Sequence, residues 1–445
     1  MLGGICVHTW YCQLTSCIGS PLLFPLRGIN ATKVLFSSSC QNFRAICSIS
    51  EVKKKDKVIV ISGPTGSGKS RLALELAKKL NGEIISADSV QVYQGLDIGS
   101  AKPSNSDRKE IAHHLLDVLH PSEEYSAGKF FKDARKATEH IIQRGNVPIV
   151  VGGTGLYLRW YIYGKPDVPR ACANVTYDAY SEIEQFERNG QWGAAVEFVA
   201  EAGDPKVHFL PRNNWYRLRR SLEIIKSSGL PPSAFQVPYD SFRGRQTCLK
   251  EEHNDKGLDY DFICFFLSTQ RIDLYRSIDL RCEEMLVANP GILTESSWLL
   301  DSGLIPNGKS STKAIGYRHA MEYLQHCREV NGQCSPGDFY TFLSEFQRVS
   351  RNFAKRQMIW FRNELIYHWL DASRPLDEVL DFIHDSYHDE KSTDLMVPEV
   401  LRMRRDGTSH HEEKKLKRYR PINLLFTRSE DCSEILDWIR KTQSR

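Results

Sequence analysis

Acidic residues are missing from the first fifty positions of this 445-residue chain, which hold only three basic residues and a serine cluster at 37–39. An acid-free segment with scattered Arg and Ser is typical of organellar transit peptides. A charged start and a compact apolar block, the marks of a secretory signal, are also missing. We therefore expect residues 1–50 to be a disordered, transit-peptide-like leader, with an untargeted leader of a cytoplasmic protein as the alternative.

Long apolar runs and paired cysteines are lacking as well. No stretch of about 18 apolar residues occurs, so we expect no contact with a membrane. Five of the 12 cysteines lie in the leader, and the other seven form no C-x-x-C pair. Reduced thiols are then expected, not a zinc site or a disulfide framework. The formal net charge of +4 is too small to indicate nucleic acid by itself, so such a partner must show in local clusters.

A glycine-rich loop follows the strand-like run 57–61 and precedes the helical run 71–80. It consists of Gly63, Pro64, Thr65, Gly66, Ser67, Gly68, Lys69 and Ser70, and it matches G-x-x-x-x-G-K-[ST]. Backbone N–H groups of such a loop close around phosphate oxygens, while Lys69 adds a full positive charge and Ser70 a ligand for Mg²⁺. The sequence predicts a phosphate-binding site here.

Strand-like and helical runs alternate from the loop to about residue 165. Buried strands are expected at 58–61, 83–86 and 147–151, and a helix at 126–143 with Ser126 as its N-cap. This order indicates an α/β fold, a P-loop NTPase-like core with a parallel sheet flanked by helices. Residues 262–267 read as an apolar strand that returns to the sheet, and helices are expected from 270 to 370, among them one over Phe342–Leu370.

Changes of composition divide the chain further. After the leader we expect a first part of the core at 51–169, then a helical insertion domain at 170–250. A second part of the core with basic helices follows at 251–388, and a charged C-terminal extension at 389–445.

Two further turns are expected at the carboxyl ends of strands, beside the phosphate loop. Asp88 ends the strand 83–86, where a carboxylate can hold Mg²⁺ or accept a proton, although it could also simply cap the next turn. Gly152, Gly153, Thr154 and Gly155 follow the strand 147–151 and bring a hydroxyl towards the same cleft, unless they form only a tight strand-to-helix turn.

Basic residues gather on two helical segments. Arg217 and Arg220 share a face at i,i+3, which suits phosphate oxygens. Arg348, Arg351, Lys355 and Arg362 form a stripe with apolar backing from Phe346, Val349, Phe353 and Trp360. Such a stripe suits a polyanionic backbone, although a solvated surface is the plainer explanation.

Together these motifs resemble the tRNA isopentenyltransferase (tRNA dimethylallyltransferase) family over residues 57–385. The resemblance rests on the phosphate loop, Asp88-Ser89, Asp97–Pro103, His114–Asp117, Tyr125-Ser126, Gly152–Tyr157, Arg217–Glu223, Ile315–Arg318 and Lys355–Arg362. These motifs occur in the family's order. The acid-free leader and basic tail look like a plant member, which would make the destination a plastid or mitochondrion.

The resemblance implies a prenyltransferase that moves a dimethylallyl group from dimethylallyl diphosphate to N6 of an adenosine beside the tRNA anticodon. Asp88 would be the general base, Thr154 would lie near the reacting atoms, and Ser70 would hold Mg²⁺ with the diphosphate. The helical insertion would clasp the anticodon stem of the tRNA, and the enzyme is expected to be a monomer. Turnover of the modified tRNA would supply cis-type cytokinin. The residues expected to touch tRNA are Ser89, Val90, Gln91, Arg217, Arg220, Lys313, Gly316, Tyr317, Arg318, Lys355, Arg356, Gln357, Trp360 and Arg362.

One departure from the family pattern leaves a question open. Ser277 stands where an arginine is usual, so Arg271, Arg276 or Arg281 would have to replace its diphosphate contact, and the sequence does not choose among them. Two other functions share the loop: an adenylate isopentenyltransferase acting on free AMP, ADP or ATP, and a small-molecule kinase or NTPase. The helical insertion and the basic helix favour tRNA, and no convincing Walker B strand supports the kinase.

Overall fold

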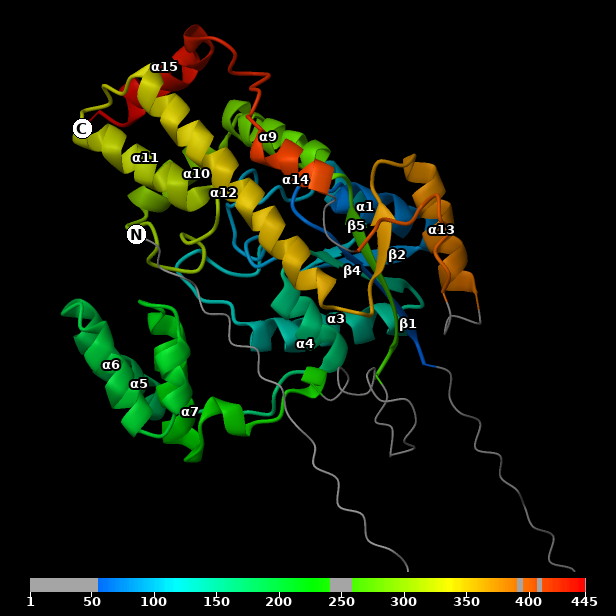
Figure 1. Ribbon diagram of the computed structural model, residues 1–445, viewed down its shortest axis with the longest axis horizontal. Coiled ribbons are helices and arrows are strands. Elements are labelled where there is room, and N and C mark those ends of the chain that lie inside the picture. Colours follow the sequence, from blue (N-terminus) through cyan, green and yellow to red (C-terminus); the bar gives the residue numbers. More distant parts are fainter. Residues whose placement is uncertain (1–54, 241–257, 390–394, 406–409, 445) are drawn as a thin grey trace, which may run out of the picture. The chain divides into compact units, whose positions relative to one another are not determined.

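Six parallel strands form the sheet of the computed structural model, in the order β3-β2-β4-β1-β5-β6 (Figure 1). The structure describes residues 55–240, 258–389, 395–405 and 410–444, so the expected leader lies outside the described residues. The strands are β1 Lys57–Ser62, β2 Gly82–Ser86, β3 His113–His114, β4 Val147–Gly152, β5 Asp261–Ser268 and β6 His368–Asp371. All four expected strands are confirmed, and the α/β class with them. The two edge strands β3 and β6 were not expected, because they are only two and four residues long.

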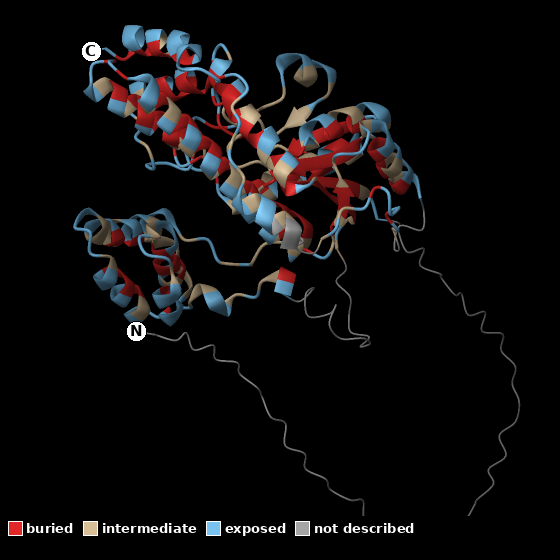
Figure 2. Ribbon diagram, turned by 45° about the horizontal axis from the view of Figure 1, so that its top comes forward, coloured by how far each residue is buried: buried red, intermediate tan, exposed pale blue. Residues whose placement is uncertain are grey.

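Helices cover both faces of the sheet because its central strands are buried on both sides. Val58 and Val60 of β1 belong to one apolar cluster, and the alternate residues Ile59 and Ile61 belong to another. This is the period-2 alternation of a strand. The first cluster packs under α3 Ala127–Gln143, α4 Gly155–Tyr163, α9 Arg271–Val287 and α12 Pro336–Arg362. The second packs under α1 Lys69–Leu80 and α13 Leu376–His388. Figure 2 shows the buried residues running along the strands.

The segment expected to be a helical insertion is helical. It contains α5 Ala173–Arg188, α6 Trp192–Glu201, the 3-10 turn η1 Pro205–Phe209, α7 Trp215–Ser228 and the short turn η2 Pro232–Ala234. These helices bury an apolar cluster of their own, which includes Ile183, Val199 and Leu222. The last part of the expected insertion, 241–250, lies outside the described residues.

The long basic helix differs from its expected bounds. It begins earlier, after the N-cap Ser335 with Pro336 in its first turn, and it ends at Arg362. Leu370, expected at its end, belongs instead to strand β6, which pairs with β5. Periodicity alone missed this change because the apolar residues continue from the helix into the strand. The core also contains α2 Asn105–Glu110, α10 Ile292–Asp301 and α11 Tyr317–Glu329.

The end of the chain packs into the main core. Residues 410–444 form α14 His410–Lys417, the turn η4 Ser429–Cys432 and α15 Ser433–Thr442. Phe426, Leu436 and Ile439 are buried in the cluster that α9 and α12 share. The carboxylate of Glu283 on α9 accepts backbone N–H groups from residues 424–426. The charged extension is therefore docked on the core by buried contacts.

One cysteine expectation is wrong. The structure joins Cys327, at the end of α11, to Cys334 by a disulfide across seven residues. The sequence analysis considered only C-x-x-C spacing, and these two cysteines are seven residues apart. Cys264, Cys282 and Cys432 are buried free thiols, as expected. Among the described residues, no helix is both long and apolar enough to cross a membrane.

Removing the Phe426 side chain tests the docking of the C-terminal segment. Phe426 is 2% exposed and its ring lies 5.0 Å from that of Phe339. We expect Phe426→Ala to lower the free energy of unfolding by about 3–5 kcal/mol, because it leaves a cavity. Leu424→Ala, at a position that is 61% exposed, should change it by less than about 0.5 kcal/mol. Urea denaturation measures both, and equal values would mean that the segment does not share the core.

Candidate functional site

The phosphate loop joins β1 to α1 at the carboxyl end of the sheet. Gly66 and Gly68 have φ angles of 81° and 80°, a region that side chains with a Cβ rarely adopt. With these two glycines the loop turns its backbone towards the start of α1, where the first helical N–H groups have no partner within the helix. The local sequence thus produces the anion cradle that the motif predicts.

Lys69 is the first residue of α1. Its ammonium donates to the carbonyl oxygen of Pro64 at 3.3 Å, across the loop. Burial lowers the pKa of the Lys69 ammonium to about 8; the charge of Arg281 contributes to the lowering and that of Asp88 opposes it. The three charged groups are therefore close enough to act on one another. Ser70 follows on the exposed side of the same turn.

Asp88 lies just beyond the end of β2. Its Oδ1 accepts the backbone N–H of Val90 at 2.8 Å and that of Gln91 at 3.4 Å, so the capping role considered from the sequence is present. The residue also lines the cavity beside the loop. A carboxylate has room for further hydrogen bonds, so capping leaves Asp88 able to accept a proton.

The glycine turn after β4 lies beside both features. The hydroxyl oxygen of Thr154 accepts the backbone N–H of Ser89 at 3.2 Å, which ties this turn to the Asp88 turn. Gln357 of α12 is buried between the turn and the phosphate loop. Its amide oxygen accepts the N–H of Thr65 at 2.9 Å, and its amide nitrogen donates to Gly153 O at 3.0 Å.

A cavity of about 730 Å³ lies between these elements. Its walls come from the phosphate loop, the Asp88 turn, the segment 97–104, and helices α9 and α12. Charged groups gather at the loop, while Leu116, Met285 and Phe353 supply apolar surface. A cavity with an anion cradle at one end and apolar walls suits a phosphorylated ligand that carries a hydrocarbon part.

Arg281 answers the question that the sequence left open. It lines the cavity, and its charge acts on both Lys69 and Asp88. Burial lowers the pKa of its guanidinium. Arg276 is exposed and pairs with Asp273 at 3.2 Å. Arg271 is buried, but it does not line the cavity. Of these three arginines, only Arg281, one helical turn beyond Ser277, lines the cavity and is placed to contact an anion in the cradle.

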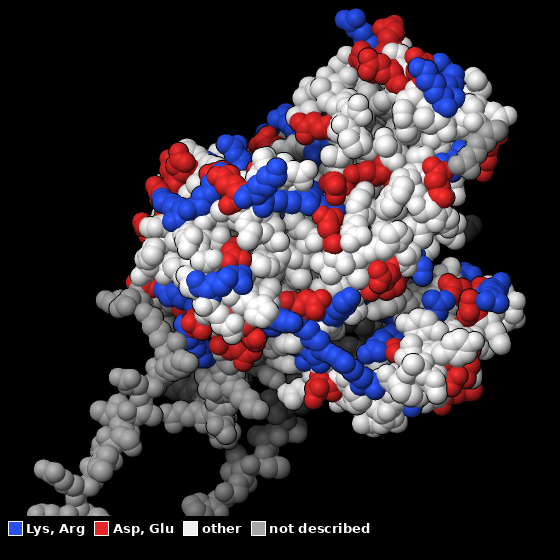
Figure 3. Space-filling model, turned by 180° about the vertical axis from the view of Figure 1, so that it is seen from behind, with Lys and Arg blue, Asp and Glu red and all other residues white. Residues whose placement is uncertain are grey.

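The residues expected to touch tRNA fall into three groups. Arg217, Lys313, Lys355 and Arg356 are exposed. The partly buried ones are Ser89, Val90, Gln91, Arg220, Arg318, Trp360 and Arg362. Two of these have acidic partners, since Arg220 pairs with Glu223 and Arg318 with Glu322. Figure 3 shows basic and acidic residues interspersed on one face of the molecule. An RNA-binding surface on this face would therefore be a small cluster of basic residues and not the whole face.

Gly316, Tyr317 and Gln357 form the third group, which is buried. Tyr317 is 0% exposed and its hydroxyl donates to Glu295. Gln91 is also occupied, because its amide accepts from Ser86 Oγ and donates to the carbonyls of Ser100 and Ala101. The structure gives the side chains of Tyr317, Gln357 and Gln91 protein partners, so they are not free to contact RNA. A tRNA contact at Gly316, which has no side chain, stays a prediction.

Sequence reasoning missed several cavity residues. Met285 and Phe353 are ordinary apolar helix residues, and no signal in the sequence distinguishes them from the core. Arg351, part of the expected basic stripe, pairs instead with the buried Asp279. Its 3, 4 and 7 spacing is correct for a helix face, but spacing does not reveal which face carries an acidic neighbour.

The strand, glycine loop and helix around Lys69, in a parallel sheet, define an α/β protein of the P-loop class, with a cavity beside the glycine loop. The family model for IPP transferase matches residues 91–364. The chain is 58% identical over 401 residues to tRNA dimethylallyltransferase 9 of Arabidopsis thaliana, covering 87% of this chain and 86% of that protein. It is 36% identical to tRNA dimethylallyltransferase of Protochlamydia amoebophila, covering 75% and 90%.

Two solved structures are also similar. One is the tRNA isopentenylpyrophosphate transferase of Bacillus halodurans, with a TM-score of 0.50, 32% identity and coverage of 75% and 97%. The other is a eukaryotic dimethylallyltransferase acting on tRNA, with a TM-score of 0.58, 25% identity and coverage of 77% and 81%. The chain belongs to the IPP transferase family.

The lowered pKa of Lys69 gives a pH dependence that can be measured. Above about pH 8 the amine loses its charge, so affinity for inorganic diphosphate should fall as the pH rises through that value. Titration calorimetry with Lys69→Arg as the control separates this loss from the titration of diphosphate itself, because arginine stays charged. If the ratio of the two diphosphate affinities, wild type to variant, stays constant across this pH range, Lys69 does not bind the anion.

Proposed function

We propose that the protein transfers a dimethylallyl group from dimethylallyl diphosphate to N6 of an adenosine next to the anticodon of tRNA. The observation that carries this proposal is that Lys69, Arg281 and the carboxylate Asp88 line one cavity, where their charges act on one another. The two cations suit the leaving diphosphate and the carboxylate suits the proton of the amine. The names of the similar proteins support tRNA as the acceptor.

The diphosphate end is assigned to the phosphate loop. Loop N–H groups, Lys69 and Arg281 would bind the diphosphate oxygens and stabilise the charge that develops as the bond from C1 to oxygen breaks. The ammonium and the guanidinium already line the cavity that contains the loop, so little reorganisation is needed when that charge appears.

The amine end is assigned to Asp88. As N6 attacks C1, the new nitrogen–carbon bond forms, diphosphate leaves with the bonding electrons, and the surplus N6 proton passes to the carboxylate. An exocyclic amine is a weak nucleophile, so alignment and proton removal must act together. Thr154 would act by fixing the backbone at Ser89, next to this carboxylate.

Magnesium fits the loop as a partner of the diphosphate. Among the described residues no cluster of three or more His, Cys, Asp or Glu side chains could hold an ion, so phosphate oxygens and water would have to supply most ligands. The Ser70 hydroxyl, exposed in the first turn of α1, would supply one. When bound, the ion neutralises part of the diphosphate charge.

Asp88→Asn tests the general base. The amide oxygen of asparagine can still accept the N–H of Val90, so the turn should survive. We expect turnover to fall at least about 10²-fold, because a positioned base contributes about 10²–10⁴, while affinity for an anticodon stem-loop stays within about twofold. Prenylation of the stem-loop is followed by mass spectrometry, with AMP as the competing acceptor. Full-rate turnover by the variant, or a preference for AMP, would refute the assignment.

The exposed residues of α12 test the tRNA surface. Lys355→Ala with Arg356→Ala should weaken binding of the stem-loop and reduce its salt slope by about 0.7–0.9 for each phosphate that these side chains no longer neutralise. Arg440→Ala with Lys441→Ala is the matched control, since it removes two exposed charges from α15. Fluorescence anisotropy at several salt concentrations gives both slopes. If the α12 variant and the control have identical salt slopes, the exposed basic residues of α12 are an ordinary solvated surface and do not contact tRNA.

A further inference from the structure

A loop that forms one wall of the cavity is held from behind by another helix. Residues 97–103, here called the wall loop, place Asp97, Ile98, Ser100 and Ala101 on the cavity surface. This segment has no regular secondary structure beyond turns. Its position must therefore be fixed by contacts outside its own backbone.

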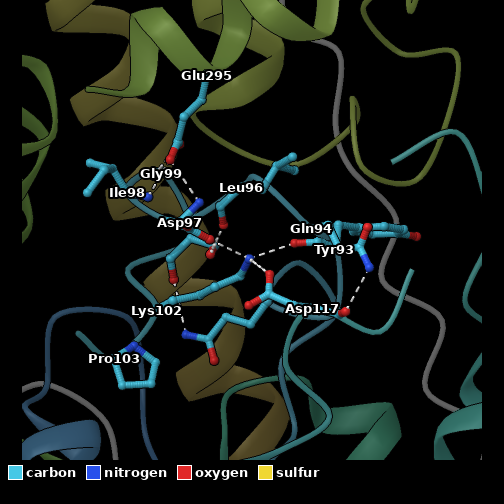
Figure 4. Close-up of polar contacts among 12 residues, drawn as sticks. Tyr93, Gln94, Leu96, Asp97, Ile98, Gly99, Lys102, Pro103, Asp117 and Glu295 are labelled. Carbon is cyan, nitrogen blue, oxygen red and sulfur yellow. Dashed lines mark hydrogen bonds and ion pairs between the residues drawn. The ribbon is translucent and has the colours of Figure 1, made fainter. Parts of the chain in front are cut away.

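Glu295 of α10 supplies those contacts. Its Oε1 accepts the backbone N–H groups of Asp97 at 2.8 Å and Ile98 at 2.7 Å, and its Oε2 accepts that of Gly99 at 3.1 Å. Figure 4 shows the carboxylate meeting these consecutive N–H groups. Glu295 is only 7% exposed, and it does not line the cavity. A buried carboxylate thus binds three amides of one loop.

Tyr317 of α11 completes the arrangement. Its hydroxyl donates to Oε2 of Glu295 at 2.6 Å. Its ring lies so close to Gly99 that a Cβ there would be 2.8 Å from Cε2. Glycine at position 99 is therefore required by close approach, and the wall loop rests directly on α11.

A second anchor holds the other end of the wall loop. The ammonium of Lys102 donates to Tyr93 O at 2.6 Å, to Asp97 Oδ1 at 2.7 Å and to Asp117 Oδ1 at 2.6 Å. Its three protons are used, and its side chain is 1% exposed. Figure 4 shows it turned towards these oxygens. Lys102 therefore acts within the wall and is not free to bind diphosphate.

The wall loop is also linked to the base. Gln91 donates to the carbonyls of Ser100 and Ala101, and the backbone N–H of Gln91 lies 3.4 Å from Asp88 Oδ1. Hydrogen bonds at 97–99, the loop backbone, and the hydrogen bonds of Gln91 thus connect Glu295 to Asp88.

We propose that Glu295 is a positioning residue for the transfer reaction, which fixes the cavity wall and, through Gln91, the orientation of Asp88. This inference rests on the proposed function for its kinetic readout. The phosphate cradle comes from other elements, β1, α1 and α9. Glu295 should therefore affect the alignment of the amine and of Asp88, but not the binding of diphosphate.

Glu295→Gln tests it. The amide has one accepting and one donating end, so in either orientation a backbone N–H of the wall loop faces a donor. We expect kcat on the stem-loop to fall at least about tenfold, while the dissociation constant of inorganic diphosphate stays within about twofold. Hydrogen exchange of the amides at 97–99 should become faster, and this readout does not depend on activity.

Ser297→Ala is the matched control. Ser297 lies two residues along α10 and accepts from Arg328 at 3.1 Å and from Gln443 at 3.0 Å. Its loss should lower the melting temperature and leave kcat and exchange at 97–99 close to those of the wild type. Tyr317→Phe keeps all three amide bonds and should reduce kcat less than Glu295→Gln does. If Glu295→Gln does not fold, Glu295→Asp replaces it, with the same expected order of effects.

Two results would overturn the proposal. One is Glu295→Gln with exchange at 97–99 and kcat like those of the wild type. The other is Ser297→Ala slowing turnover as much as Glu295→Gln at equal loss of stability, which would make Glu295 merely structural. If the wild type forms no prenylated product but exchange at 97–99 still rises in Glu295→Gln, the proposed function fails and the anchoring of the wall loop stands.

Discussion

Two positive charges held beside one glycine loop are the constraint on which the rest of the site depends. Arg281 lies close enough to Lys69 for its charge to lower the pKa of the Lys69 ammonium, and burial lowers the pKa of both groups. Within the part of the chain that the structure describes, Arg281 forms no hydrogen bond or ion pair. Two cations in such a place are unfavourable until an anion arrives, because burial and like charge both oppose ionisation. A bound diphosphate would relieve this cost, which is why we propose that the site takes an anion anchored by both cations.

The sheet explains how these groups meet. The phosphate loop follows β1, Asp88 follows β2, the Thr154 turn follows β4 and α9 follows β5. Parallel strands bring all these carboxyl ends to one edge. Helix α12 then crosses this edge, and Gln357 joins two of the turns by hydrogen bonds to their backbones. The site is therefore assembled from residues 65–357 and could not form from any one part of the core.

Much of this could be predicted from local sequence. The glycine loop, the four longer strands and the Ser126 N-cap follow from short sequence patterns whose structure depends on neighbouring residues alone. The structure confirms them. Other features depend on contacts between distant segments. The choice of Arg281 over Arg276 depends on which side of α9 meets the loop. The hydroxyl of the buried Tyr317 bonds to Glu295, 22 residues away. The pairing of Arg351 with Asp279, and the docking of Phe426, likewise join segments that no periodicity connects.

The most direct test compares two arginines on the same helix. Single-turnover prenylation of an anticodon stem-loop, with the affinity for inorganic diphosphate measured in parallel, would be run on Arg281→Met and Arg276→Met. Removal of a charged hydrogen-bond donor from the cavity wall should weaken diphosphate binding by at least about tenfold in Arg281→Met and slow transfer with it. Arg276→Met should behave like the wild type. Normal diphosphate affinity in Arg281→Met, or the larger loss in Arg276→Met, would contradict the account.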